Sequence, residues 1–308
     1  MDEFELIRKY FVRPNDASGV TLGIGDDGAV LQPDPGRELV TVVDTLVAGV
    51  HFPHALDAGD IGYRAVAVNL SDIAAMGARP RWMTLALTVP SADEQWLGSF
   101  AAGLHTAAAE HGVALVGGDT TSGPYIVVSV QITGDIAPGA ALRRDGARVG
   151  ETVYITGTVG DAAAGLELMS AGRQDDYLLS RFRRPTARVE FGMLLAGKVG
   201  AAIDVSDGLY GDLQKLLAAS GVGASIDLDH LPLSAALQAN FDVATQRRFA
   251  LAGGDDYELC FTARPAVLPH CEAPRVTAIG IVTKERGIVC RDRGATVDYQ
   301  DSGYRHFQ

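Results

Sequence analysis

One short pattern recurs at four widely separated places in this sequence: an apolar run, then small residues, then aspartate. The four stretches are VVDT (42–45), GGDTT (117–121), IDVSDG (203–208) and GGDDYE (253–258). A single aspartate at a loop start has an ordinary explanation, because aspartate favours turns and helix caps. Four repeats are a stronger constraint, since the apolar runs are typical of strands and the strand ends of a mixed sheet meet at one rim. We therefore expect sheets whose ends gather carboxylates from both halves of the chain into one pocket.

Strands and helices alternate along the chain, which predicts an α/β fold (α+β in places) with mixed sheets. The first half has predicted strands at 38–46, 81–90, 113–121 and 124–136, and predicted helices within 59–80 and 92–112.

The alternation stops once and then starts again. Residues 138–150 lose the periodicity and gather glycine and arginine, so we expect two domains, 1–137 and 151–308, with 138–150 as the linker. In the second half, 201–221 is expected to form a strand, a loop and a helix capped by Ser206. Residues 275–292 are expected to form a terminal hairpin.

The stretch GIGDDG (23–28) matches G-x-G-x-x-G, the spacing of a dinucleotide-binding turn. Such a turn must open a helix whose N-terminus receives the pyrophosphate. Here a strand-like run and a proline turn follow, and Asp26 and Asp27 occupy two of the remaining positions. The dinucleotide interpretation fails on this context, and the glycines indicate only a sharp bend or a close approach.

Charge and cysteine content exclude several classes of protein. The net charge is −12, whereas nucleic-acid-binding proteins need basic patches. No apolar run approaches the roughly 20 residues of a membrane-spanning helix, and the acidic start MDEFELIRKYF is unlike a signal peptide. The three cysteines form no C-x-x-C, which suits a reducing compartment. We expect a cytoplasmic protein that binds neither nucleic acid nor membrane.

Carboxylates gathered at one rim repel each other unless cations lie between them. Oxygen ligands without histidine or cysteine favour Mg²⁺ or Ca²⁺ over zinc, and Mg²⁺ prefers to share its coordination shell with substrate phosphates. The chain contains neither G-x-x-x-x-G-K-[ST] nor the protein-kinase signatures. The acids are therefore predicted to hold a phosphorylated ligand indirectly, through metal ions.

Asp72 lies on an otherwise apolar stripe of a predicted helix. A carboxylate there needs a partner, which is either a metal ion or a hydrogen bond from Asn69 or Ser71.

The histidines and arginines are less informative. His51 and His54 form a weak zinc pattern, because nothing else of zinc character lies nearby. Arg143 and Arg144, in the linker, are either phosphate contacts or a solvated pair of charges.

Seven ordered motifs resemble those of the thiamine-monophosphate kinase family, which belongs to the superfamily of aminoimidazole-ribotide synthetase and selenophosphate synthetase. The motifs cover nearly the whole chain: GIGDDGAV, VDTLVAGVHF, AVNLSDIAAMGARP, GGDTT, TGTVGDAAAGL, IDVSDGL and GGDDYEL. The resemblance implies transfer of the γ-phosphate of ATP to thiamine monophosphate, assisted by several Mg²⁺ ions and without a side chain as general base. It also implies a two-domain fold of the aminoimidazole-ribotide synthetase type and a homodimer that pairs through the N-terminal domains.

The resemblance assigns roles to residues at matching motif positions. It implies metal ligands at Asp27, Val42, Val43, Asp44, Asp72, Asp119, Asp204 and Asp207. It implies nucleotide contacts at Gly118, Asp119, Arg144 and Ser206, and contacts on the thiamine side at His51, Asp255 and Tyr304.

Two positions depart from the family pattern. Asp255 stands where glutamate is common, so a direct substrate contact there could become water-mediated. Val42 and Val43 stand where serine or threonine is frequent, so only their backbone carbonyls can bind metal.

Two alternative functions stay open at this point. One is another ATP-dependent synthetase of the same superfamily, although the first half lacks a cysteine for selenium chemistry. The other is a divalent-cation-binding protein without catalysis.

Overall fold

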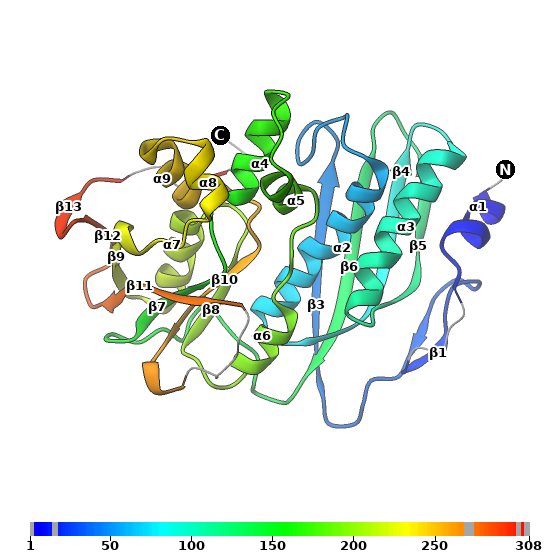
Figure 1. Cartoon of the computed structure of the whole chain (residues 1–308). Helices are drawn as coiled ribbons and strands as arrows, with labels where there is room; N and C mark the ends of the chain where they lie inside the picture. The colour runs from blue at the N-terminus through cyan, green and yellow to red at the C-terminus, as the bar shows by residue number, and fades with distance from the viewer. Residues whose placement is uncertain (1–2, 14–17, 268–273, 300–302, 305–308) are drawn as a thin grey trace. The chain divides into compact units, whose positions relative to one another are not determined.

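The structure, a computed structural model, describes residues 3–13, 18–267, 274–299 and 303–304 (Figure 1). The chain divides into two compact units. The N-terminal unit is Met1–Ile73 with Ala78–Pro138, and the C-terminal unit is Ala74–Gly77 with Gly139–Gln308.

The N-terminal unit is built on a four-stranded sheet in the order β3-β6-β4-β5, in which only the β4–β5 pair is parallel. Helices α2 and α3 lie along one face of this sheet (Figure 1). A two-stranded ribbon, β1–β2, and helix α1 complete the unit. The elements are α1 (Glu3–Tyr10), β1 (Val20–Leu22), β2 (Val30–Leu31), β3 (Glu38–Val47), α2 (Ala58–Ala75), β4 (Arg79–Val89), α3 (Glu94–Glu110), β5 (Ala114–Ser122) and β6 (Val127–Ile136).

Glycines let α2 and α3 approach at backbone distance. A Cβ on Gly62 would collide with the carbonyl of Phe100, and one on Gly103 would collide with the carbonyl of Gly59. Helix α2 ends before Gly77, whose φ of 72° is costly for a residue with a side chain.

The C-terminal unit is built on a seven-stranded sheet in the order β13-β12-β9-β11-β7-β10-β8. Helix α7 packs against it with a buried leucine stripe: Leu209, Leu213, Leu216 and Leu217. The strands are β7 (Thr152–Thr156), β8 (Ala201–Val205), β9 (Gly223–Asp227), β10 (Glu258–Ala263), β11 (Val276–Thr283), β12 (Gly287–Asp292) and β13 (Ala295–Val297). The helices are α4 (Asp161–Ser170), α5 (Asp176–Arg183), α6 (Val189–Leu195), α7 (Leu209–Ser220), η1 (Leu228–His230), α8 (Ala235–Asn240), α9 (Val243–Ala252) and η2 (Pro265–Val267).

Both sheets contain parallel and antiparallel pairs, so the predicted α/β fold with mixed sheets is confirmed. The predicted hairpin at 275–292 is wrong, because β9 lies between β11 and β12, antiparallel to the first and parallel to the second. Gly223 makes this insertion possible, since a Cβ there would collide with the carbonyl of Glu285 in the connection between the two strands.

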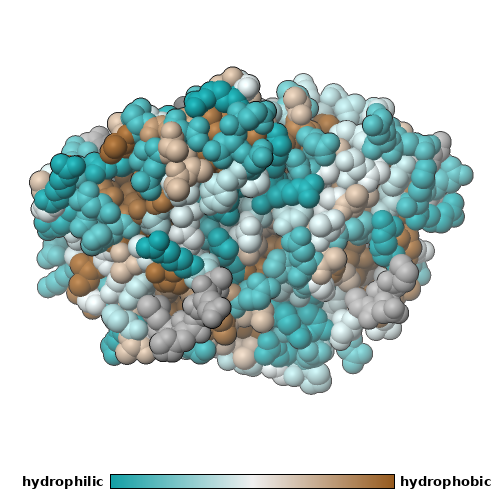
Figure 2. All heavy atoms as spheres, viewed as in Figure 1, coloured by the Kyte–Doolittle hydropathy of each residue, from teal (hydrophilic) through white to brown (hydrophobic). Residues whose placement is uncertain are grey.

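Hydrophilic residues cover most of the face shown in Figure 2. No helix among the described residues combines the length and the apolar character that crossing a bilayer requires.

Candidate functional site

The GIGDDG stretch forms the loop between β1 and β2, which pair antiparallel. A strand, not a helix, follows the loop, so rejection of the dinucleotide-binding turn is confirmed. The loop forms one wall of a cavity of about 410 Å³. Asp27 from this loop, Gly118 and Asp119 from β5, and Ile7 and Phe11 at helix α1 all line the cavity.

Asp27 and Asp119 are exposed, and no side chain among the described residues pairs with either carboxylate. Two ionised carboxylates that share a cavity repel each other, and a cation between them relieves that repulsion. The sequence prediction that these distant residues come together is therefore supported within the N-terminal unit.

Gly118 gives this wall of the cavity its shape. Its φ is 153°, and a Cβ there would collide with the carbonyl of Leu85 on β4. Only glycine fits this backbone, and its lack of a side chain leaves the adjacent surface open to a ligand.

Asp44 lies on the outer strand β3, at the same level of the sheet. The register joins Asp44, Val130, Leu85 and Gly118 in one row across four strands. Three spacings of about 4.8 Å separate the backbone of Asp44 from that of Gly118, a distance on the order of 14 Å.

Val42 and Val43 are successive residues of the edge strand β3. The carbonyls of neighbouring residues in a strand point to opposite sides, so only one of the two can face away from β6. The backbone therefore offers a single carbonyl from this pair at the free edge.

Asp72 is half-buried near the end of α2. Asn69 is fully buried and its Nδ2 donates to the carbonyl of Ala65 at 3.0 Å, so Asn69 does not supply the hydrogen bond to Asp72, and Ser71 remains the structural alternative to a metal ion. The Oδ1 atom of Asn69 is buried without a hydrogen-bond partner.

His51, Arg143 and Arg144 differ in whether their side chains have partners among the described residues. Nδ1 of His51 accepts the backbone N–H of Val47 at 3.0 Å. Arg143 is exposed and pairs with Asp145, with Nε donating at 2.8 Å. The exposed side chain of Arg144 has no partner among the described residues, which favours Arg144 as the phosphate contact.

In the C-terminal unit, Asp204 lies buried in β8, and Ser206 and Asp207 form the loop that leads to α7. The prediction that Ser206 caps this helix is wrong, because Gly208 occupies the N-cap position. The carboxylate of Asp212, one turn into the helix, accepts the backbone N–H groups of Ser206, Asp207 and Gly208 instead.

The GGDDYE stretch holds the same loop from the other side. The N–H of Asp255 donates to the carbonyl of Ser206 at 2.8 Å, and that of Tyr257 donates to Val205 at 2.8 Å. Asp255 and Tyr257 adopt φ of 72° and 52°, and the Tyr257 hydroxyl donates to Oδ1 of Asp255 at 3.0 Å. A non-glycine residue held in this left-handed backbone conformation destabilises the fold by about 1–3 kcal/mol, and such residues cluster at functional sites.

Tyr304 also reaches this loop, since its N–H donates to the carbonyl of Asp207 at 3.1 Å. A Cβ on the preceding Gly303 would collide with that carbonyl. Within the C-terminal unit, the structure therefore joins the three predicted positions Ser206, Asp207 and Asp255 to Tyr304 through backbone hydrogen bonds.

Sequence reasoning placed Asp256 among the recurring carboxylates without giving it a role, and it missed Glu258. Asp256 is fully buried and accepts the N–H groups of Gly160 and Ala162 at the start of α4. Glu258 is fully buried and pairs with Arg181 and Arg188. Both acids support the fold around the site.

Burial raises the pKa of the buried acids Asp212 and Asp256, whereas hydrogen bonds raise the pKa of Lys215. Burial raises the pKa of Asp212, and the hydrogen bond from Lys215 only partly opposes the rise. Burial also raises the pKa of Asp256 well above its ordinary value, against the N–H of Gly160. For Lys215, burial lowers the pKa, but hydrogen bonds to Asp207 and Asp212 outweigh it and the net pKa is raised.

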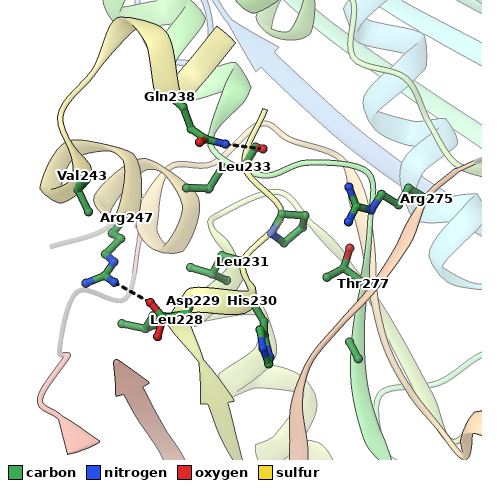
Figure 3. Close-up of a pocket in the computed structure, with 12 residues that line it drawn as sticks. Leu228, Asp229, His230, Leu231, Leu233, Gln238, Val243, Arg247, Arg275 and Thr277 are labelled. Carbon is green, nitrogen blue, oxygen red and sulfur yellow. Dashed lines mark hydrogen bonds and ion pairs between the residues drawn. The ribbon is translucent and has the colours of Figure 1, made fainter. Parts of the chain in front are cut away.

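A separate cavity of about 550 Å³ lies in the C-terminal unit, between η1, α8, α9 and β11 (Figure 3). Its polar groups are partly engaged, since Arg247 points at Asp229 and Gln238 donates to the carbonyl of Leu233 (Figure 3). None of the site residues expected from the sequence lines it.

The donor set fits Mg²⁺. Among the described residues, no group of three or more His, Cys, Asp or Glu side chains is arranged to hold an ion, so the convergence of the carboxylates on one metal site stays a prediction. A cation that binds such scattered carboxylates must take most of its ligands from water and substrate, as Mg²⁺ does. The unpartnered carboxylates of Asp27 and Asp119 and the orphaned Oδ1 of Asn69 are suitable oxygen donors.

Comparison with known proteins identifies both halves of the chain. Two family models match: AIR synthase related protein, N-terminal domain, at residues 25–136, and AIR synthase related protein, C-terminal domain, at residues 148–293. The Escherichia coli (strain K12) protein named thiamine-monophosphate kinase is 44% identical over 320 aligned positions, which cover 99% of this chain and 98% of that protein.

Solved structures agree with this match. The thiamine-monophosphate kinase of Stenotrophomonas maltophilia K279a superposes with a TM-score of 0.87 at 44% identity, over 94% of this chain and 96% of that one. A structure named AaThiL complexed with AMPPCP and TMP gives a TM-score of 0.80 at 32% identity and covers 92% of each chain. Identity at this level over the full length shows that the chain belongs to the thiamine-monophosphate kinase family.

Proposed function

We propose that this chain transfers the γ-phosphoryl group of ATP to the phosphate of thiamine monophosphate, giving ADP and thiamine diphosphate. The observation that carries the proposal is the cavity of the N-terminal unit, where Asp27 and Asp119 present unpartnered carboxylates beside the open backbone of Gly118. Full-length relatives with this activity in their names, and a relative complexed with AMPPCP and TMP, support it.

Several Mg²⁺ ions belong to this proposal; when bound, they would neutralise the phosphates and align them for in-line transfer. Six aspartates and one carbonyl of the Val42–Val43 pair would hold these ions. The aspartates are Asp27, Asp44, Asp72, Asp119, Asp204 and Asp207.

The chain's own groups position and bind rather than move protons. A phosphomonoester is ionised at neutral pH, so the acceptor oxygen needs no general base. The unpartnered guanidinium of Arg144 is available to a phosphate of the nucleotide. On the acceptor side, His51, Asp255 and Tyr304 are proposed to contact thiamine monophosphate, and the shorter side chain of Asp255 is compatible with a contact through water.

The proposal includes a homodimer formed through the N-terminal unit. On the face of the sheet away from α2 and α3, Leu39 and Val43 of β3 are 51% and 64% exposed. A second copy that covers this face would bury them, and size-exclusion chromatography with light scattering measures the resulting mass. The proposal places the protein in the cytoplasm, since Cys260 and Cys290 are buried and unbridged; Cys271 lies outside the described residues.

Purified protein incubated with Mg²⁺, ATP and thiamine monophosphate is expected to yield ADP and thiamine diphosphate in equal amounts, measured by chromatography. A panel of other phosphate and ribotide acceptors distinguishes a synthetase of the same superfamily. Turnover of ATP with another acceptor, and none with thiamine monophosphate, would contradict the proposal. Uptake of Mg²⁺ by calorimetry without nucleotide binding would instead favour a cation-binding protein.

A further inference from the structure

Every backbone polar group of Ser206 and Asp207 is already used inside the C-terminal unit. The two N–H groups donate to Oδ2 of Asp212 at 3.0 and 2.9 Å. The carbonyl of Ser206 accepts from Asp255, and that of Asp207 accepts from Tyr304. The two residues therefore have no free backbone N–H to offer a ligand, and each of their carbonyls already accepts one hydrogen bond.

The side chain of Asp207 is also partly engaged. Nζ of Lys215 donates to its Oδ2 at 2.6 Å and to Oδ1 of Asp212 at 2.8 Å, so one ammonium ties the two carboxylates together. Oδ1 of Asp207 accepts no hydrogen bond among the described residues. The side-chain atoms that the two residues leave without a partner among the described residues are thus Oγ of Ser206 and Oδ1 of Asp207.

The geometry points to Asp212 as a positioning residue for the proposed kinase reaction, and to Lys215 as a second positioning residue that acts together with it. Asp212 is 1% exposed and touches no ligand itself. It acts by collecting three successive N–H groups on one oxygen, which fixes the loop, while Lys215 fixes the rotamer of Asp207. A buried ionised carboxylate holds N–H groups more firmly than a neutral oxygen does.

Asp255 and Tyr304 hold the carbonyls of the loop, but among the described residues only Asp212 holds its N–H groups. Gly208 adopts φ of 121° and contributes no side chain, and the helix that follows begins only at Leu209. Residues that orient the direct ligands of a metal typically cost about 10–100-fold in metal affinity or activity when they are replaced. We place Asp212 in that range.

The test replaces Asp212 with asparagine, which keeps the shape of the side chain and removes its charge. Binding of Mg²⁺–AMPPCP, measured by calorimetry without turnover, is expected to weaken about 10–100-fold, with the Mg²⁺ activation midpoint moved to higher concentration. The KM for thiamine monophosphate is expected to change by a smaller factor than the affinity for Mg²⁺–AMPPCP, because Asp212 holds Ser206 and Asp207 directly and reaches Asp255 and Tyr304 only through that loop.

Glu151→Gln is the matched control. Glu151 is a buried carboxylate of the same unit that accepts the N–H of Arg148 and the hydroxyl of Thr262, away from the loop. This variant is expected to lower the Tm while binding Mg²⁺–AMPPCP as wild type does. If Asp212→Asn also loses only Tm, Asp212 is merely structural and the inference is overturned.

Lys215→Met covers the case in which Asp212→Asn does not fold, because the side chain of Lys215 is 46% exposed. Without the bridging ammonium, Asp207 and Asp212 repel each other and Asp207 loses its orientation. We expect Mg²⁺–AMPPCP to bind about tenfold more weakly, with Lys215→Arg restoring most of the affinity. Tighter binding by Lys215→Met would show that the ammonium competes with metal, and would overturn the inference.

The inference rests on the proposed function for the identity of the reaction, but its binding test does not use turnover. A wild-type protein that binds Mg²⁺–AMPPCP and does not phosphorylate thiamine monophosphate would refute the proposed function. The comparison between Asp212→Asn and Glu151→Gln would still decide the role of Asp212.

Discussion

The two units present their acidic residues in opposite ways. In the N-terminal unit, Asp27 and Asp119 are exposed at a cavity and no described side chain pairs with them. In the C-terminal unit, Asp207 and Asp212 share a lysine, and Asp212 also holds three backbone N–H groups. The first arrangement leaves charge to be neutralised by a ligand, whereas the second fixes a loop before any ligand arrives. Preorganisation of this kind lowers the conformational entropy that the site loses when a ligand binds.

Asp135 is a buried acid of the N-terminal unit that pairs with arginines and does not line the cavity. Its fully buried carboxylate accepts from Arg37, Arg79 and Arg81, at 3.0, 3.0 and 2.6 Å, at the end of β6. None of these arginines lines the cavity that contains Asp27 and Asp119. The cluster therefore stabilises the sheet. In this unit, the acid that stabilises the fold, Asp135, is distinct from the acids proposed to bind the ligand, Asp27 and Asp119.

The largest expected effect is on stability, in Asp135→Asn. Removing this buried charge leaves the buried Arg81 with only the half-exposed Asp34 as its charged partner and Arg37 with none among the described residues, so the free energy of unfolding is expected to fall by about 3–5 kcal/mol. Denaturant titration at neutral pH measures this loss. Where the variant remains folded, KM and kcat should stay within about twofold of wild type, and a selective loss of activity would contradict the separation of roles.

The same residue predicts a pH dependence. Burial opposes ionisation of Asp135, but the hydrogen bonds from Arg79, Arg37 and Arg81 outweigh it, so the pKa lies below its ordinary value of 3.8. A lowered pKa gives stability that is present above the unfolded pKa and is lost as the pH falls through the folded one. The stability gap between wild type and Asp135→Asn should therefore narrow below about pH 4. A gap that stays constant down to pH 2 would show that charge is not its cause.

Asp119→Asn is expected to have the next largest effect, and on activity alone. Removing one preorganised electrostatic contact typically costs about 10²–10³ in kcat, or about 2.7–4 kcal/mol. Because the carboxylate is exposed and lacks a protein partner, the free energy of unfolding should stay within about 0.5 kcal/mol of wild type. Steady-state kinetics on one preparation check the loss of kcat, and thermal melts on the same preparation check the unchanged stability. A variant with near-normal kcat would remove Asp119 from the site.

The acid-bearing loops can be located in the sequence because each is a local pattern, and what they bind stays a prediction. Asp27 and Asp119 were expected to meet, and they line one cavity. Ser206, Asp207 and Asp255 were expected at strand ends, and backbone hydrogen bonds join them. Strand, glycine and aspartate lie within a few residues of each other in every case, so no long-range information is needed to find them.

The sequence did not reveal what supports those loops. Asp212 lies on α7 between the buried Leu209 and Leu213, and an acid so close to an apolar stripe is the only signal of its role. Its three N–H partners depend on how the loop folds back, which no periodicity encodes. The hairpin expected at 275–292 failed for a similar reason, since the insertion of β9 is a long-range pairing.

The smallest expected effect concerns the contact between Tyr257 and Asp255. Tyr257 is buried at φ of 52°, and its hydroxyl donates to Asp255 at 3.0 Å, which holds the carboxylate in one orientation. Tyr257→Phe removes one hydrogen bond worth about 1 kcal/mol and leaves the strained backbone in place. Since Asp255 is proposed to contact thiamine monophosphate, the KM for that substrate should rise about fivefold with kcat unchanged. A rise in the KM for ATP instead, or a hundredfold loss of kcat, would contradict this prediction. Asp255 would then belong to the preorganised acids that serve the nucleotide, and its proposed contact with thiamine monophosphate would be wrong.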